Sequence, residues 1–390
     1  MQSRAVTVGA RRRPWVMTPA QAVVIGFLGA IAVATALLSL PIAHAPGVEV
    51  TLLQAAFTAV SAVCVTGHIV VDTATVWSPF GHAVIVAFIQ IGGLGIMLVA
   101  SLIGLALLRR VSLRGRMVAG AENRGVTTGD AARLARGILL VSLVIEAIVA
   151  VILTLQFWLG YGVALPTALG RTNLVLAMTG LLLVLGTVII ALFEWSNPAT
   201  IGEMSPVDRV LVSFFHSVQT RTAGFNSVDI GQMTSESWLV MDVLMFIGGG
   251  PAGTAGGIKV TTFAVLLFII ITELRGEGAV NIFGKRLSRA VHREAITITL
   301  LSMAAVMGAT IALMVMTRLD LDVLLFEVVS AFGTVGLSTG ITASLPPAGQ
   351  LILMLLMFLG RLGPLTLGTA LVLRQRRVLY ELPKERPVIG

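Results

Sequence analysis

Four short segments of this 390-residue chain share a pattern that is able to bind a cation through backbone oxygens. Each segment has four residues with glycine in third place, and the four are Val65-Thr66-Gly67-His68, Thr222-Ala223-Gly224-Phe225, Thr254-Ala255-Gly256-Gly257 and Thr334-Val335-Gly336-Leu337. Glycine allows backbone conformations that other residues disfavour, so neighbouring carbonyls can turn toward one axis and replace a cation's hydration shell. A single element would indicate little, because glycine is common in membrane helices. Its repetition in a matching context is informative.

The elements that must position these segments are short helices. Amphipathic stretches at 50–63, 207–218 and 321–332 precede the first, second and fourth segments. They are too short to cross a hydrocarbon core about 30 Å thick, so we expect pore helices that lead into re-entrant loops. The third segment lies instead inside a long apolar run, 238–273.

The composition is that of a multi-pass membrane protein, with 56% hydrophobic and 12% charged residues and a mean hydropathy of +0.96. The first apolar run imitates a secretory signal peptide but exceeds the usual h-region of about 7 to 15 residues, which predicts a retained span. Seven runs are long enough to cross a bilayer, at 19–42, 80–108, 137–160, 174–193, 238–273, 295–317 and 349–373.

Arginine clusters between these runs predict the orientation. The N-terminus and the segments 109–136, 285–293 and 374–386 are basic and should be cytoplasmic, so the re-entrant loops enter from outside. The runs 137–160 and 174–193 would then both leave the cytoplasm, although 161–173 is too short to return between them. The sequence therefore predicts that a span is missing there.

Seven segments resemble one known family when they are taken together. They are AVCVTGHIVVDT at 62–73, QIGGLGIM at 90–97, FEWSNPATIG at 193–202, QTRTAGFNSVD at 219–229, GGGPAGTAGGIKVTTF at 248–263, SAFGTVGLSTGIT at 330–342 and MFLGRLGPLTLG at 357–368. This set is similar to the Trk/Ktr/HKT superfamily of potassium transporters, and within it to the KtrB-like membrane subunits, from about Thr18 to Leu373. The resemblance implies an all-α polytopic membrane protein with repeated helix/pore-loop/helix units around a central pore, four in the family and about three and a half here.

The resemblance also implies roles for the repeated segments. The selectivity filter would comprise Val65, Thr66, Gly67, Thr222, Ala223, Gly224, Thr334, Val335 and Gly336, with K⁺ at the backbone carbonyls of Thr66, Gly67, Thr222, Gly224, Thr334 and Gly336. The stretch 248–257 would be the broken middle of the third inner helix and would form an intramembrane gate. The gate residues would be Gly249, Gly250, Gly253, Thr254, Gly256, Gly257, Lys259 and Arg361.

The chain departs from the family in its second repeat, because the filter and the inner helix of that repeat are absent and 172–193 already resembles the start of the third. We therefore expect five regions: 1–17 as cytoplasmic N-terminus, 18–110 as repeat 1, 111–171 as cytoplasmic loop and partial repeat 2, 172–274 as repeat 3 with the gating loop, and 275–390 as repeat 4 and cytoplasmic C-terminus.

The function implied by the resemblance is potassium uptake across the cell membrane by the ion-translocating subunit, as a homodimer docked on a cytoplasmic KtrA/TrkA-like ring of nucleotide-binding regulatory subunits. The basic segments 109–136 and 275–293 offer surfaces for that ring or for anionic lipids. Whether Na⁺ also takes part stays open, and no organic cofactor is expected. The alternative is a transport-incompetent or incomplete relative that acts as a partner or assembly protein.

An enzyme is not expected. Gly248-x-Gly250-x-x-Gly253 satisfies the dinucleotide-binding fingerprint formally, but it lies in an apolar run with no preceding strand. No phosphate loop or metal-binding spacing is visible.

Two cations lie in or beside apolar runs and need an explanation. A lipid-facing guanidinium at Arg361 would cost at least about 2.5 to 3.5 kcal/mol, so it must face protein or water. It is either a latch that binds carbonyls of the gating loop or a structural staple between helices. Lys259 either adds positive charge near the pore mouth or extends toward the interface.

Four further polar residues need an interpretation: three have two alternative roles each, and the fourth has one structural role. His68 either tunes cation entry with pH or is a tolerated surface histidine. Asp72 and Asp229 either concentrate cations outside the filter or cap helix ends. Glu194 is expected to cap the outer end of its own helix.

Overall fold

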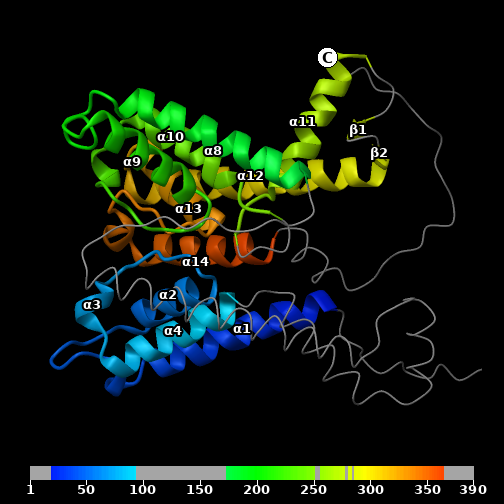
Figure 1. Cartoon of the computed structure of the whole chain (residues 1–390). Coiled ribbons are helices and arrows are strands. Elements are labelled where there is room, and N and C mark those ends of the chain that lie inside the picture. Colours follow the sequence, from blue (N-terminus) through cyan, green and yellow to red (C-terminus); the bar gives the residue numbers. More distant parts are fainter. Residues whose placement is uncertain (1–18, 94–172, 251–254, 277–279, 283–284, 364–390) are drawn as a thin grey trace, which may run out of the picture.

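The computed structural model describes residues 19–93, 173–250, 255–276, 280–282 and 285–363. Within these ranges the chain is almost entirely helical (Figure 1). The elements are α1 (Pro19–Leu38), η1 (Pro41–Ala43), α2 (Leu52–Val63), α3 (Thr73–Val76), α4 (Pro79–Gly93), α8 (Asn173–Glu194), α9 (Pro206–Gln219), η2 (Ile230–Gln232), α10 (Ser235–Phe246), α11 (Val260–Leu274), β1 (Asn281–Ile282), β2 (Lys285–Arg286), α12 (Arg289–Thr317), α13 (Leu321–Gly333), η3 (Thr342–Ser344) and α14 (Pro347–Leu362).

One arrangement occurs three times in the described part of the chain. A long outer helix is followed by a short helix, a loop and an inner helix, in the sets α1–α2–α4, α8–α9–α10 and α12–α13–α14. In each set the short helix packs against its outer helix. The helix/pore-loop/helix unit expected from the sequence is therefore confirmed, and α2, α9 and α13 begin and end within two residues of the predicted stretches. The run 137–160 lies outside the described residues.

Local sequence explains where the short helices begin. Thr51 caps α2 in a capping box with Gln54, in which each side chain accepts a hydrogen bond from the other residue's backbone N–H. Ser205 caps α9 and is followed by Pro206, whose fixed φ suits the first turn of a helix. These signals are local, which is why the short helices are predictable from sequence.

The long run 238–273 is broken into α10 and α11, as the resemblance implied. Ile247 and Ile258 pair in an isolated parallel bridge, and the Gly248 N–H donates to the Ile258 carbonyl at 2.8 Å. Glycine is required on both sides of this bridge. A Cβ atom on Gly248 would overlap the Gly256 carbonyl oxygen, and Gly257 has a φ of +65°.

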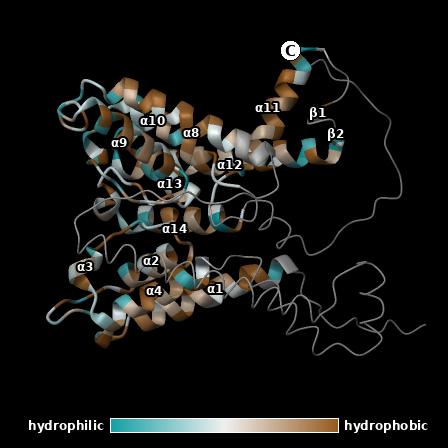
Figure 2. Cartoon of the chain, in the orientation of Figure 1, coloured by the Kyte–Doolittle hydropathy of each residue, from teal (hydrophilic) through white to brown (hydrophobic). Residues whose placement is uncertain are grey.

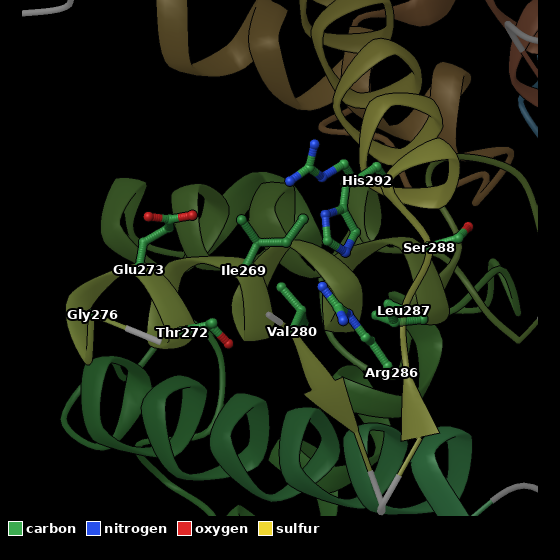
Figure 3. A pocket seen from close by; sticks show the side chains of 10 residues that line it. Ile269, Thr272, Glu273, Gly276, Val280, Arg286, Leu287, Ser288 and His292 are labelled. Atoms are coloured by element: carbon green, nitrogen blue, oxygen red, sulfur yellow. The ribbon is translucent and has the colours of Figure 1, made fainter. Parts of the chain in front are cut away.

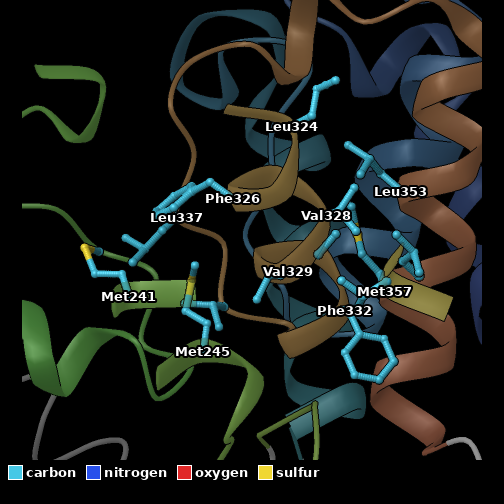
Figure 4. Packing of buried hydrophobic residues seen from close by; sticks show 14 of the residues in the cluster. Met241, Met245, Leu324, Phe326, Val328, Val329, Phe332, Leu337, Leu353 and Met357 are labelled. Carbon is cyan, nitrogen blue, oxygen red and sulfur yellow. The ribbon is translucent and has the colours of Figure 1, made fainter. Parts of the chain in front are cut away.

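The core lies where α10, α13 and α14 meet (Figure 4). Phe332 and Phe326 of α13 are fully buried there with Met241 and Met245 of α10 and Met357 of α14. Because α13 is covered on nearly all sides, the loop that follows it is held by a rigid element.

Hydrophobic residues also predominate along the long outer helices (Figure 2). Leu300 and Val315 of α12 are 62% and 78% exposed, as expected for surfaces that face lipid. Among the described residues, α12 alone has both the length and the composition of a membrane-crossing helix, and six shorter helices are also apolar.

Candidate functional site

The three loops predicted to bind the cation share one unusual backbone conformation. In each, the first residue and the glycine two positions later both have positive φ: Val65 and Gly67, Thr222 and Gly224, Thr334 and Gly336. Only one other non-glycine residue of the described chain, Arg318, has positive φ. A left-handed conformation costs a non-glycine residue about 1–2 kcal/mol, so strain at three equivalent positions indicates a shared functional requirement.

This alternation has a direct consequence for the carbonyl groups. Alternating left- and right-handed residues gather successive N–H groups on one side of the chain, so their carbonyl oxygens face the other side. The same residue pattern thus presents a row of oxygens from each loop. Such rows are what a dehydrated cation needs.

The loops approach each other through their backbones. A Cβ atom on Gly336 would overlap the carbonyl oxygen of Thr66 and would lie 3.1 Å from the Cα of Gly67. A Cβ atom on Gly224 would lie 2.6 Å from the carbonyl oxygen of Val335. The fourth loop therefore touches both the first and the third, and the absence of side chains at these glycines permits that approach.

A cavity lies between the first and third loops. Its volume is 370 Å³, and it is lined by both loops and by residues of α2 and α4. Its lining residues on the two loops are Val65, Thr66, Gly67, His68, Ile69, Thr222, Ala223, Gly224 and Phe225. Among the described residues that line this cavity, none comes from the fourth loop.

A buried glutamate binds the residues that follow the fourth loop. Glu327 of α13 accepts hydrogen bonds from the Thr339 N–H at 3.0 Å, from the Thr342 hydroxyl at 2.9 Å and from the Ser338 hydroxyl. The sequence pattern did not single it out, although a carboxylate in the apolar middle of LDVLLFEVVSAFG is a detectable signal. It positions the chain that follows Gly336.

His68 extends this cluster to the first loop. Its side chain is fully buried, and its Nδ1 lies 3.5 Å from a Glu327 carboxylate oxygen. The interpretation of His68 as a surface residue is therefore wrong. The imidazole follows Gly67 directly, so the contact joins the first loop to α13, whose Glu327 lies 259 residues later in the sequence.

Glu327→Ala is expected to lower the free energy of unfolding by about 3 kcal/mol or more, because each buried donor left unpaired costs about 1–3 kcal/mol. Glu327→Gln should cost less, since its amide oxygen can still accept from Ser338 and Thr339. Thermal unfolding in detergent measures both changes. Asp72→Ala is the control, because it removes an exposed carboxylate that caps a short helix. An equal effect of Asp72→Ala and Glu327→Ala would show that the buried cluster is not important for stability.

The predicted gating segment lies directly against the fourth loop. The Gly256 N–H donates to the Thr334 hydroxyl at 2.9 Å, and a Cβ atom on Gly256 would lie 2.7 Å from the Gly333 carbonyl oxygen. Gly249 and Gly250 precede this contact in the chain, and Gly253 and Thr254 lie outside the described residues. The segment is thus in direct hydrogen-bonded contact with Thr334.

The two predicted gate cations have different partners. The Lys259 Nζ donates to the Ala255 carbonyl, so the side chain turns back to the segment rather than toward the interface. Arg361 is buried in α14 and donates through Nη2 to the Gly92 carbonyl at the end of α4. That contact supports the staple reading, and the latch on 248–257 stays a prediction.

Asp72, Asp229 and Glu194 each accept backbone hydrogen bonds near the start of a helix. Asp72 accepts from the Ala74 N–H and Asp229 from the Gly231 N–H, both at 3.0 Å, which is the capping alternative. Glu194 does not cap its own helix, and that expectation is wrong. Its carboxylate is buried and accepts from the Thr234 N–H at 2.8 Å and the Ser237 hydroxyl at 2.6 Å, at the start of α10.

Comparisons with known proteins agree with this geometry. Residues 163–378 match the family profile TrkH, described as "Cation transport protein". The chain is 35% identical over 414 aligned positions to the "Ktr system potassium uptake protein B" of Bacillus subtilis, covering 90% of this chain and 93% of that protein. It is 32% identical over 431 positions to the protein of the same name from Vibrio alginolyticus, covering 94% of each.

Two further similarities are more distant. The "Potassium/sodium uptake protein NtpJ" of Enterococcus hirae is 28% identical over 441 positions, covering 96% of this chain and 98% of that protein. The crystal structure of the potassium transporter TrkH from Vibrio parahaemolyticus superposes with a TM-score of 0.66 at 18% identity, covering 93% of this chain and 87% of that chain. This last likeness concerns the fold.

Proposed function

Because the chain belongs to the TrkH family of cation transport proteins, a family of membrane transporters rather than enzymes, we propose that it is the ion-translocating membrane subunit of a potassium uptake system. Potassium is named for each of the curated relatives described above, and sodium for one of them. The observation that carries the proposal is the set of three loops with identical alternation of φ, packed backbone to backbone. Side chains do not line this contact, so carbonyl oxygens are the available ligands.

The filter is proposed to bind K⁺ through the carbonyls of Thr66 and Gly67, of Thr222 and Gly224, and of Thr334 and Gly336. The alternating conformation supports this assignment because it directs the oxygens of each loop to one side. Val65, Thr222 and Thr334 each come directly or within three residues after one of the short helices α2, α9 and α13. Na⁺ is a second candidate ion, suggested only by the name of the Enterococcus protein.

The gate is proposed to be the segment from Gly249 to Gly257 with Lys259 and Arg361. The Gly256–Thr334 hydrogen bond supports a coupling between this segment and the filter. Positive charges of Lys259 and Arg361 near the path would oppose a cation until they move. In this proposal Arg361 also anchors α14 to α4 through Gly92.

The second candidate function, an incomplete relative that does not transport by itself, is favoured by a specific feature of the alignments. The relatives from Bacillus, Vibrio and Enterococcus each require about 63 to 67 aligned positions that have no residue in this chain. We propose that these positions belong to repeat 2, between Gly160 and Thr172. The cavity between the first and third loops supports this, since in chain order a loop of repeat 2 would come between these two loops.

The same proposal divides the chain into repeats 18–110, 172–274 and 275–390, with a partial repeat in 111–171. The three helix sets described above fall within the first three of these ranges. A cytoplasmic N-terminus, a homodimer and a regulatory KtrA/TrkA-like ring complete the proposal. The printed name "Ktr system" of the relatives is consistent with several components.

Cation-dependent stability tests ion binding by the chain without requiring flux. K⁺ should raise the unfolding midpoint of the purified protein more than Na⁺ or choline at equal ionic strength. A ligand at 100 times its dissociation constant adds about 2.7 kcal/mol to the free energy of unfolding. Gly224→Ser should remove the K⁺ effect, because its Cβ would lie 2.6 Å from the Val335 oxygen. Equal stabilisation by K⁺ and Na⁺ would argue against a potassium filter.

A further inference from the structure

A second cavity lies outside the filter and the gating segment, between the end of α11 and the start of α12 (Figure 3). Its volume is 740 Å³. The lining residues come from α11, from the β1–β2 hairpin region and from the first turn of α12: Ile269, Thr272, Glu273, Gly276, Val280, Arg286, Leu287, Ser288, Arg289 and His292. No role in ion conduction accounts for this site.

Exposed arginines and one buried imidazole nitrogen line this cavity without a protein acceptor for their charge or proton among the described residues. Arg286 and Arg289 form no ion pair, since the one such pair in the described part of the chain is His68–Glu327. The Nε2 atom of His292 is buried without a hydrogen-bond partner. In Figure 3 the Arg286 guanidinium and the His292 ring point toward the same space, and Glu273 lies at the other end of the cavity. Two unpaired donors that converge in this way indicate a place for an anion.

The start of α12 adds to the positive potential. Ser288 is the N-cap residue of this 29-residue helix, and its side chain makes no capping hydrogen bond. The N–H groups of the first turn therefore lack a side-chain acceptor, and the helix dipole favours an anion beside them. Ser288 lines the cavity together with Arg289, so this end of the helix faces the same space.

The surroundings of the cavity indicate which anion it takes. Ile270 and Leu274 near the end of α11 are 56% and 83% exposed, beside the cavity-lining residues Ile269 and Glu273. The apolar part of α12 begins only after Arg293. The cavity therefore lies at the border between a lipid-facing apolar surface and polar loops, which is the depth of phospholipid headgroups.

We propose that this cavity binds the phosphate group of an anionic membrane phospholipid. Arg286 and His292 donate to the phosphate oxygens, the first turn of α12 faces the same charge, and the acyl chains lie along Ile270 and Leu274. A phosphate group can accept two parallel hydrogen bonds from a guanidinium. The lipid's acyl chains would also cover apolar side chains that are otherwise exposed. The site requires a membrane location and is independent of the filter assignment.

The test measures lipid binding to the purified full-length protein in detergent, by native mass spectrometry and by the shift of the unfolding midpoint. Phosphatidylglycerol should bind in preference to phosphatidylcholine. Arg286→Gln should weaken phosphatidylglycerol binding about fivefold, the effect of one cation at a membrane surface. Arg293→Gln is the matched control, because it removes an exposed arginine of α12 that does not line the cavity, and it should change binding less than twofold.

Three outcomes would overturn the proposal. The first is an equal loss in Arg286→Gln and Arg293→Gln, which would show general attraction to negative charge. The second is equal binding of both lipids. The third is displacement of phosphatidylglycerol by inorganic phosphate or ATP, which would assign the cavity to a soluble phosphate. His292→Gln gives an independent check, since it keeps a polar side chain and should weaken binding in the same direction as Arg286→Gln.

Discussion

Gly336→Ser is expected to abolish discrimination between potassium and sodium in a background that transports. The new Cβ atom would overlap the Thr66 carbonyl oxygen, which is one of the proposed ligands, and the φ of +90° disfavours any side chain. Either the Thr66 oxygen or the fourth loop must move, and the geometry that replaces the hydration shell is lost. Because 1.4 kcal/mol corresponds to a factor of ten, we expect the potassium-to-sodium uptake ratio to fall at least about tenfold.

Gly340→Ser separates backbone strain from close approach. Gly340 has nearly the same φ, +96°, but nothing lies within 4 Å of its Cβ position. This variant should therefore lose some stability and keep its ion selectivity. The uptake ratio of both variants, measured with the two cations in competition, decides between the explanations. If Gly336→Ser keeps the normal ratio, Gly336 does not belong to a filter.

The helices and loops are largely predictable from the sequence because the residues that determine them act locally. The capping box at Thr51 and Gln54, Pro206 after Ser205, and the glycines at 248–257 act within a few residues of their own positions. The repeated glycine elements are recognisable for the same reason. A glycine that needs positive φ must be specified in its own loop, whatever lies opposite it.

The polar contacts were less predictable because their partners are distant in the chain. The surface reading of His68 failed since Glu327, 259 residues later, provides its buried partner. Burial of Arg361 was expected from the cost of a charge in lipid, but that argument does not choose between Gly92 and the gating segment as acceptor. Glu194 shows the same limit, because its acceptor role at the start of α10 depends on how two helices pack.

The 390-residue chain is expected to support no more than background potassium uptake in a bacterial strain that lacks its own uptake systems, with the regulatory subunit present. In the described part of the chain three loops approach one another and a cavity lies between the first and the third, so the proposed pore lacks the loop of repeat 2 on that side. Passage along an incompletely enclosed path is therefore expected to be poor, even where the three loops bind potassium in preference to sodium. Insertion of the corresponding segment of the Bacillus subtilis relative between Gly160 and Thr172 should restore growth at low potassium.

The restored chain also resolves the conflict in orientation. A pore helix and filter followed by a returning span of about 20 residues account for much of the absent length. They allow the basic segments 109–136 and 285–293 to lie on the same side of the membrane. An insert of equal length from a Gly/Ser-rich linker is the control, because it supplies length without a filter, and it should not restore growth. Normal uptake by the unmodified chain would show that three filter loops suffice. The cavity between the first and third loops would then have to be closed by other residues.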